Sequence, residues 1–154
     1  MEAALINPFI QATIDTYKDM IFENSLKPAV PFLKKDPYPN YDISTTIGLS
    51  GKAAGIISIA FPDIEVALKT ISAMVCAPVT EKSPDLADGV GEIVNIVAGY
   101  AKKWLVSYAL EISLPSVIKG NHFICTPSGV PCIVVPFDSK YGKLSMEVAL
   151  VTKK

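Results

Sequence analysis

The sequence predicts an α+β fold in which helices pack on a mainly antiparallel sheet. Apolar and polar residues alternate over residues 41–50, as in a strand with one buried face. A turn at Ser50-Gly51-Lys52 then leads into a second apolar segment, residues 54–61, which predicts a hairpin. Residues 84–110 instead carry apolar side chains at helical spacing, and more strand-like segments follow them. Strands joined by tight turns are antiparallel neighbours, and the helices then cover their sheet.

Two shorter helices are expected before the longest one. Asn7-Pro8 predicts a helix start, because Asn caps a helix and Pro fits its first turn. This first helical pattern fades by residues 24–25. Residues 25–40 contain four of the twelve prolines and predict an irregular connector. Pro62-Asp63 ends the hairpin and caps a second helix, which Pro78 ends.

The longest helix is expected to start at Ser83-Pro84 and to run to about Leu110. Its apolar stripe follows the helical period and comprises Val90, Ile93, Val94, Val97, Ala101, Trp104, Leu105 and Tyr108. The strand-like segments after it cover residues 114–119, 121–126, 131–137 and 143–152, with the last hairpin turning at residues 140–143. We expect residues 1–154 to form a single domain.

Composition excludes several classes of function. Fourteen lysines against 15 acidic residues give a net charge of -1, and there is no arginine. A near-neutral chain lacks the basic surface that nucleic-acid binding needs, and without arginine it has no bidentate phosphate clamp. No apolar run approaches the roughly 18 residues that span a bilayer, and the first residues lack the signal-peptide pattern. We therefore expect a cytoplasmic protein that binds neither nucleic acid nor membrane.

The common catalytic clusters cannot be assembled from this sequence. His122 is the single histidine, and no serine or cysteine partner can be placed beside it, so neither a serine triad nor a histidine-based zinc site is expected. Cys76, Cys125 and Cys132 cannot all pair and predict reduced thiols, one of them in a predicted core helix. No acidic cluster has magnesium-binding spacing. We expect this chain to bind no metal, so that any metal used comes with a partner or substrate.

One polar row is unusual on the longest helix. Opposite the apolar stripe, a helical wheel aligns four residues that we call the ridge: Asp88, Glu92, Asn95 and Gly99. Glu92 and Asn95 are three residues apart, so their side chains stand side by side. Asn is a weak helix former, and Gly99 costs about 1 kcal/mol against alanine in a helix interior. Because Gly99 faces away from the core, we interpret it as room for the backbone of another molecule.

The functional groups on the ridge indicate a chemistry. A carboxamide both donates and accepts hydrogen bonds, so Asn95 can hold a water molecule by two contacts. The carboxylate of Glu92 can pair with a lysine of another molecule. Phosphoryl transfer asks little more of a helper protein when the substrate supplies metal and phosphate, since its catalysis is mostly positioning and electrostatics. A Glu and an Asn at this spacing are common by chance, but residues 88–102 as a whole are more specific.

At these residues the chain resembles the CheX branch of the CheC/CheX/FliY chemotaxis phosphatase family. The resemblance is strongest over Gly91-Glu92-Ile93-x-Asn95-Ile96-x-Ala98-Gly99-x-Ala101-Lys102. It extends to Asn7-Pro8-Phe9-Ile10-x-Ala12-Thr13, to Gly48-x-x-Gly51 and to Leu114-Pro115-Ser116-Val117-Ile118-x-Gly120. The family pattern is Asp or Ser, three residues, Glu, two residues and Asn, which Asp88, Glu92 and Asn95 match. A CheC-like α+β fold is implied.

Such proteins dephosphorylate CheY-type response regulators. The resemblance implies that Glu92 grips the active-site lysine of the regulator, that Asn95 aims a water at the aspartyl phosphate, and that Asp88 adds a supporting contact. It also implies a phosphorylated regulator that holds Mg²⁺ itself, and a homodimer joined through sheet edges. The first helix offers Gln11 and Asp15 but no Glu-x-x-Asn, so we expect one active ridge per chain.

Two other functions stay open on the sequence alone. A non-catalytic adaptor would bind a response regulator, a flagellar-switch component or another signalling protein through the same helix face. Such an adaptor has no need of the Asn95 carboxamide, which therefore favours catalysis. A ligand-binding α+β module would instead need a large apolar pocket, which a sequence does not reveal.

Overall fold

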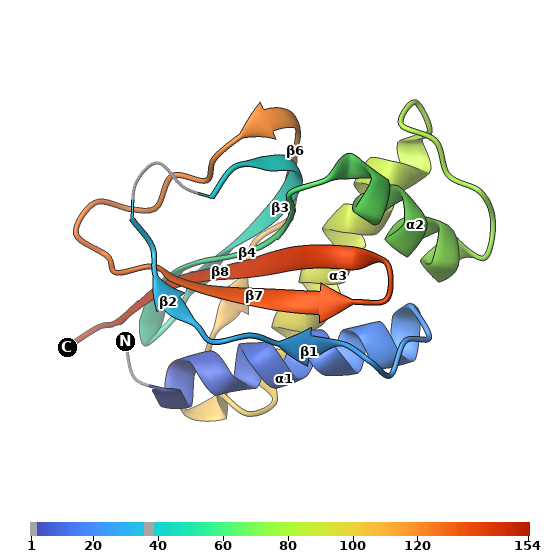
Figure 1. Ribbon diagram of the computed structural model, residues 1–154. Helices are drawn as coiled ribbons and strands as arrows, with labels where there is room; N and C mark the ends of the chain where they lie inside the picture. The colour runs from blue at the N-terminus through green and yellow to red at the C-terminus, as the bar shows by residue number, and fades with distance from the viewer. Residues whose placement is uncertain (1–2, 36–38) are drawn as a thin grey trace.

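The computed structural model describes residues 3–35 and 39–154 (Figure 1). Its strands form one continuous sheet, and its helices pack against that sheet. In chain order the elements are α1 (Ala3–Met20), β1 (Lys27–Pro28), β2 (Phe32–Leu33), β3 (Tyr41–Ser50), β4 (Ala53–Phe61), α2 (Ile64–Val75), α3 (Pro84–Lys102), the 3₁₀ turn η1 (Val106–Tyr108), β5 (Glu111–Ile112), β6 (Ser116–His122), β7 (Ile133–Ser139) and β8 (Gly142–Thr152). Helices and strands are segregated along the chain, which confirms the predicted α+β class.

The sheet has the strand order β1-β7-β8-β4-β3-β5, with β2 also on β7 and β6 also on β3. Each of these pairings is antiparallel. The predicted hairpin is present, because β3 pairs with β4 from Ile43 opposite Phe61 to Leu49 opposite Gly55. β4 and β8 form the centre, and β6 follows β3 along one edge.

The helices cover one face of this sheet and enclose the hydrophobic core with it. In Figure 1, α3 passes behind β7 and β8. Thr13 of α1 places its hydroxyl 3.6 Å from the sulfur of Met146 on β8, so α1 packs on the same face. The strands contribute alternate, fully buried side chains to this core, among them Ile43, Ile47, Ile57, Ile59, Val135, Met146 and Val148.

The opposite face of the sheet carries a buried polar network. Glu147 lies between the core residues Met146 and Val148, so its side chain points to the other face, where it is fully buried. Its carboxylate accepts from Lys34 Nζ at 2.6 Å and from the Tyr41 hydroxyl at 2.8 Å. The Lys34 ammonium also donates to the carbonyl of Ile124. Burial, reinforced by Glu147, raises the pKa of Tyr41, so that its hydroxyl stays protonated and donates.

The first helix differs from its prediction at both ends. It begins by Ala3, before Asn7, and holds Pro8 inside it, and it ends at Met20 instead of residues 24–25. Leu5 and Ile6 are buried, so extending the helix toward the N-terminus brings apolar surface into the core. That gain offsets the backbone hydrogen bond that a proline removes.

The longest helix is shorter than predicted. α3 ends at Lys102, and the chain then tightens, with backbone hydrogen bonds from Trp104 to Ala101 and from Leu105 to Lys102. These three-residue turns change the angular step of the side chains. Leu105 therefore points into the core at 2% exposure, whereas Trp104, predicted on the buried stripe, is 52% exposed.

The remaining predictions fare unevenly. The second helix is confirmed, with the Asp63 carboxylate accepting from the Glu65 backbone N–H at 2.9 Å as its cap. The connector over residues 25–40 holds two short strands that pair with β7 and were not predicted; its Pro37 lies outside the described residues. After the 3₁₀ turn, a single strand, β6, takes the place of the two strands predicted at 114–119 and 121–126. It ends at His122, and residues 123–126 are not in a strand.

In the described part of the chain, no helix is both long and apolar enough to cross a membrane.

Candidate functional site

Local sequence fixes where α3 begins. The Ser83 hydroxyl accepts a hydrogen bond from the Asp85 backbone N–H at 3.2 Å, and Pro84 occupies the first helical turn. Asp85 places a negative charge near the positive end of the helix dipole. The predicted start of this helix is confirmed, and with it the angular position of the residues up to Lys102.

Packing then decides which side of α3 faces outward. The apolar stripe is fully buried in the described structure at Val90, Ile93, Val94 and Val97. On the other side, Asp88 and Glu92 are exposed, and Asn95 and Gly99 are half-buried. The structure thus brings the four ridge residues together in one row at the surface, and the Asn95 carboxamide is not enclosed by the core.

The glycines of α3 have different surroundings. An added Cβ atom at Gly99 would meet nothing within 4 Å, so the space above this residue is open. At Gly89 it would lie only 2.7 Å from Ile71 Cγ2 of α2. Gly91 faces the start of β6, where an added Cβ would be 3.5 Å from Val117 Cγ2 and from Cγ of Pro115, which precedes the strand. Gly89 and Gly91 are buried, so they serve helix packing, and Gly99 leaves an opening on the ridge.

Alanine substitution should separate these two kinds of glycine. We expect Gly99→Ala to raise the free energy of unfolding by about 0.5–1 kcal/mol, because helix propensity improves and nothing is displaced. Gly89→Ala should lower it by about 1–3 kcal/mol, because overpacking against Ile71 outweighs propensity. Denaturant unfolding of both variants measures the difference. Shifts of the same sign would contradict the surroundings described for one of the two glycines.

Beyond the ridge, a hydrogen bond links α3 to α1. The Tyr100 hydroxyl donates to Asp19 Oδ2 at 3.0 Å, and Lys103 Nζ lies 5.0 Å from the centre of the Tyr100 ring. The hydrogen bond to the Asp19 carboxylate raises the pKa of Tyr100. α1 therefore braces the end of α3 that follows Gly99.

The histidine does have a serine neighbour, which sequence reasoning missed. His122 Nε2 lies 2.7 Å from the Ser44 hydroxyl, and Nδ1 lies 2.6 Å from the carbonyl oxygen of Gly120. Ser44 and His122 are 78 positions apart in the sequence, and only the antiparallel pairing of β3 with β6 brings them together. Ser44 is fully buried and out of reach of a substrate, so the pair joins two strands.

The described residues offer little for metal chemistry. Across residues 3–35 and 39–154, no group of three or more His, Cys, Asp or Glu side chains is placed to hold a metal ion. The ridge itself contributes two carboxylates, Asp88 and Glu92, at neighbouring turns of the helix.

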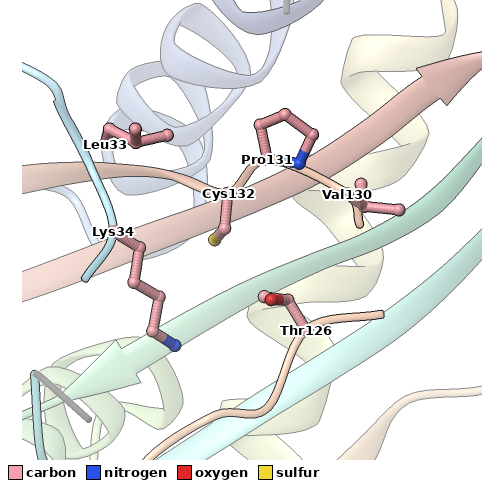
Figure 2. Close-up of a pocket in the computed structure, with 6 residues that line it drawn as sticks. All are labelled: Leu33, Lys34, Thr126, Val130, Pro131 and Cys132. Atoms are coloured by element: carbon pink, nitrogen blue, oxygen red, sulfur yellow. The ribbon is translucent and has the colours of Figure 1, made fainter. Parts of the chain in front are cut away.

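The three cysteines are free but lie in different surroundings. Cys76 follows α2 in a left-handed conformation with φ of 56° and is exposed, so it does not lie in a core helix as predicted. Cys125 is exposed as well. Cys132 is buried and, with Lys34 and Thr126, lines a hollow of about 310 Å³. Figure 2 shows the side chains that line this hollow. This hollow lies over the polar network and not at the ridge.

Thiol alkylation should distinguish the cysteines. Burial, and next the Glu147 carboxylate, raise the pKa of the Cys132 thiol to about 12. The thiolate is the reactive form, so Cys132 should resist iodoacetamide near pH 8, where Cys76 and Cys125 react. Intact mass should show two adducts on the native chain and three after denaturation. Rapid modification of Cys132 in the native chain would refute the burial described for it.

Comparison with known proteins places this architecture in context. Residues 43–138 match the family model described as chemotaxis phosphatase CheX. A CheC-like superfamily protein from Shewanella sp. PV-4 is 32% identical, with a TM-score of 0.88 over 98% of this chain and 99% of that chain. Chemotaxis protein CheX from Vibrio vulnificus is 31% identical, with a TM-score of 0.87 over 97% and 100%. No curated protein sequence matches the chain.

A third similar structure is a complex. In the CheX-CheY-BeF3-Mg complex from Borrelia burgdorferi, one chain is 26% identical to this protein, with a TM-score of 0.80. The match covers 94% of this chain and 96% of that chain. The similarity therefore extends over nearly the whole of both chains, α3 included.

Proposed function

The chain belongs to the CheX family of chemotaxis phosphatases, and on that premise we propose that it stimulates hydrolysis of the aspartyl phosphate on a CheY-type response regulator. One observation carries the proposal. Glu92 and Asn95 stand side by side at the surface of a well-packed helix, with open space above Gly99 in the same row. A row of this kind can enter the cleft of a partner without rearrangement of the core.

The proposed mechanism assigns one task to each polar side chain. The Glu92 carboxylate pairs with the active-site lysine of the regulator and fixes the approach of α3. The Asn95 carboxamide then holds a water by one donated and one accepted hydrogen bond, in line with the phosphorus–oxygen bond to be broken. The water oxygen bonds to phosphorus, the aspartate leaves as a carboxylate, and inorganic phosphate is released. Asp88 and Gly99 complete the contact surface.

Magnesium belongs to the partner in this proposal. Mg²⁺ prefers a few carboxylates together with phosphate oxygens, and a phosphorylated receiver supplies both. The ridge adds positioning and no metal ligand.

We also propose that the protein works in the cytoplasm. A reducing compartment keeps thiols unpaired, and the three cysteines of this chain are free.

We also propose a homodimer joined through the edge of the sheet at β6. In the described structure β6 pairs with β3 along one side, and the other side of the strand has no partner strand. Ile118 is 51% exposed and alternates with Val117, which faces α3, so the apolar side chain that a second copy would cover lies on the face of the sheet away from α3. Sedimentation equilibrium should give twice the chain mass, and a monomer at micromolar concentration would contradict the dimer.

The test of the proposed function is phosphate release from a receiver. A CheY-type receiver domain is phosphorylated with a small-molecule donor, and inorganic phosphate is followed with and without this protein. We expect faster release when the protein is added in catalytic amounts. Binding without acceleration would instead identify an adaptor.

Glu92→Ala should separate docking from chemistry. Because Glu92 pairs with the regulator and does not touch the water, we expect the KM for the phosphorylated receiver to rise about tenfold, the equivalent of one charge-assisted contact. The kcat should fall much less. Glu111→Ala, which removes an exposed carboxylate on β5, is the control for loss of charge. A wild-type KM in Glu92→Ala would remove this residue from the interface.

A further inference from the structure

A hollow of about 250 Å³ lies between the first turns of α3 and the edge strand β6. Leu86, Ala87 and Val117 give it apolar walls, and Leu86 is 1% exposed, so the floor of the hollow is part of the core. Lys82, Lys119 and Glu81 stand at its rim. No step of the proposed mechanism uses these residues.

The hollow is continuous with the ridge. Ala87 directly precedes the ridge residue Asp88, and Gly91 directly precedes Glu92. Gly91 faces Val117, with 3.5 Å between an added Cβ atom and Val117 Cγ2, and Val117 also lines the hollow. The row of Ala87 and Gly91 therefore borders the hollow on one side and the ridge on the other. A molecule that covers the ridge at Asp88 therefore lies next to Ala87, which lines the hollow.

The rim of the hollow is held in place. Lys119 Nζ on β6 donates to the carbonyl oxygen of Glu81 at 2.8 Å, which ties the connection between α2 and α3 to the sheet edge. The site is thus formed before a partner arrives, so little ordering is needed on binding.

Charge differs between the two neighbouring surfaces. The ridge carries the carboxylates of Asp88 and Glu92, whereas the rim carries the two ammonium groups of Lys82 and Lys119 against the single carboxylate of Glu81. A partner fits both surfaces when a basic group meets Glu92 and acidic groups meet the two lysines. A receiver domain that holds magnesium and a phosphoryl group through carboxylates has acidic side chains near its cleft.

We propose that the hollow is a second docking site for the response regulator, where it accepts an apolar side chain of the receiver flanked by acidic residues. The inference rests on the proposed function and deepens it, since it names a contact that selects the partner. The ridge acts on the phosphoryl group, and the hollow determines which receiver brings it. The lysines at the rim also speed encounter with the acidic cleft at low salt.

Filling the hollow tests the apolar contact. Ala87→Phe places a ring in the hollow and leaves Glu92 and Asn95 unchanged, and Ala29→Phe, at another exposed alanine between β1 and β2, is the matched control. We expect the KM for the phosphorylated receiver to rise about tenfold in Ala87→Phe, with kcat nearly unchanged. A wild-type KM in a folded Ala87→Phe variant overturns the apolar contact.

Charge reversal tests the rim. The double variant Lys82→Glu/Lys119→Glu is compared with Lys69→Glu/Lys143→Glu, which changes net charge by the same amount at exposed lysines elsewhere. We expect kcat/KM to fall about tenfold or more at low ionic strength in the first variant alone, with the difference shrinking as salt is added. Equal losses in the two variants would show a general charge effect and overturn the rim contact.

The outcomes for the hollow and for the proposed function are distinguishable. Loss of turnover in Asn95→Ala with wild-type KM values in both hollow variants leaves the function standing and removes the hollow. If the wild-type protein does not accelerate phosphate release, calorimetric titration with a receiver that carries beryllofluoride decides whether the hollow is a docking site. Weaker binding of the hollow variants then retains the docking site on an adaptor, and unchanged binding rejects it.

Discussion

Replacing Asn95 with alanine is expected to abolish stimulated phosphate release while the chain stays folded. The carboxamide is proposed to hold the attacking water by two hydrogen bonds, and alanine offers neither. Loss of a group that positions the reacting atoms lowers kcat by about 10²-fold or more. The position is half-buried at the surface of α3, so truncation leaves no cavity in the core. Phosphate release under saturating receiver measures the effect.

The matched comparison is Asn95→Asp, which keeps the size of the side chain. A carboxylate cannot donate a hydrogen bond, and it adds a negative charge facing the phosphoryl group. We expect Asn95→Asp to be as inactive as Asn95→Ala, although it binds the receiver less well. Wild-type turnover in either variant would exclude Asn95 from the chemistry.

The largest effect on stability is expected from Lys34→Met. Lys34 neutralises the fully buried Glu147, with 2.6 Å between Nζ and Oε2. Removing one partner of a buried ion pair leaves an uncompensated charge and costs about 3–5 kcal/mol. A domain of this size has a free energy of unfolding of about 5–15 kcal/mol, so the loss is a large part of the total. Denaturant unfolding should show a markedly lower midpoint.

Two further variants make the interpretation specific. Lys35→Met changes the exposed neighbouring lysine and should leave the midpoint nearly unchanged. Lys34→Met/Glu147→Gln removes both charges, while the amide oxygen can still accept from the Tyr41 hydroxyl. We expect this double variant to recover most of the loss, because the penalty comes from the unpaired charge. Equal midpoints for Lys34→Met and Lys35→Met would show that the ion pair contributes nothing.

Local signals in the sequence predicted the elements that position the ridge. Ser83 and Asp63 cap their helices through a side-chain oxygen two residues before the donating N–H, so the information lies within one turn. Alternation over β3 and the return in β4 identified the hairpin for the same reason. The outward position of Glu92 and Asn95 follows from helical periodicity once the helix start is known. Their roles in hydrolysis stay predictions until the variants are measured.

Contacts between distant segments were the ones that sequence did not reveal. Ser44 meets His122 and Lys34 meets Glu147 only because strands bring them together across 78 and 113 positions. The short strands β1 and β2 depend on pairing with β7, so their residues carry no periodic signal of their own. Trp104 lies at helical spacing, yet a change to tighter turns after Lys102 moves it outward. Each of these features is set by tertiary packing, which local propensity does not encode.

The open space above Gly99 has a consequence for engineering. Conventional helix optimisation would select alanine there first, because the substitution strengthens α3 without displacing a neighbour. A library screened for heat resistance alone would therefore collect robust chains in which, on the proposed function, an added methyl group stands where the regulator approaches. Variants intended for use as reagents should be sorted by turnover before melting temperature, and this backbone position should stay fixed.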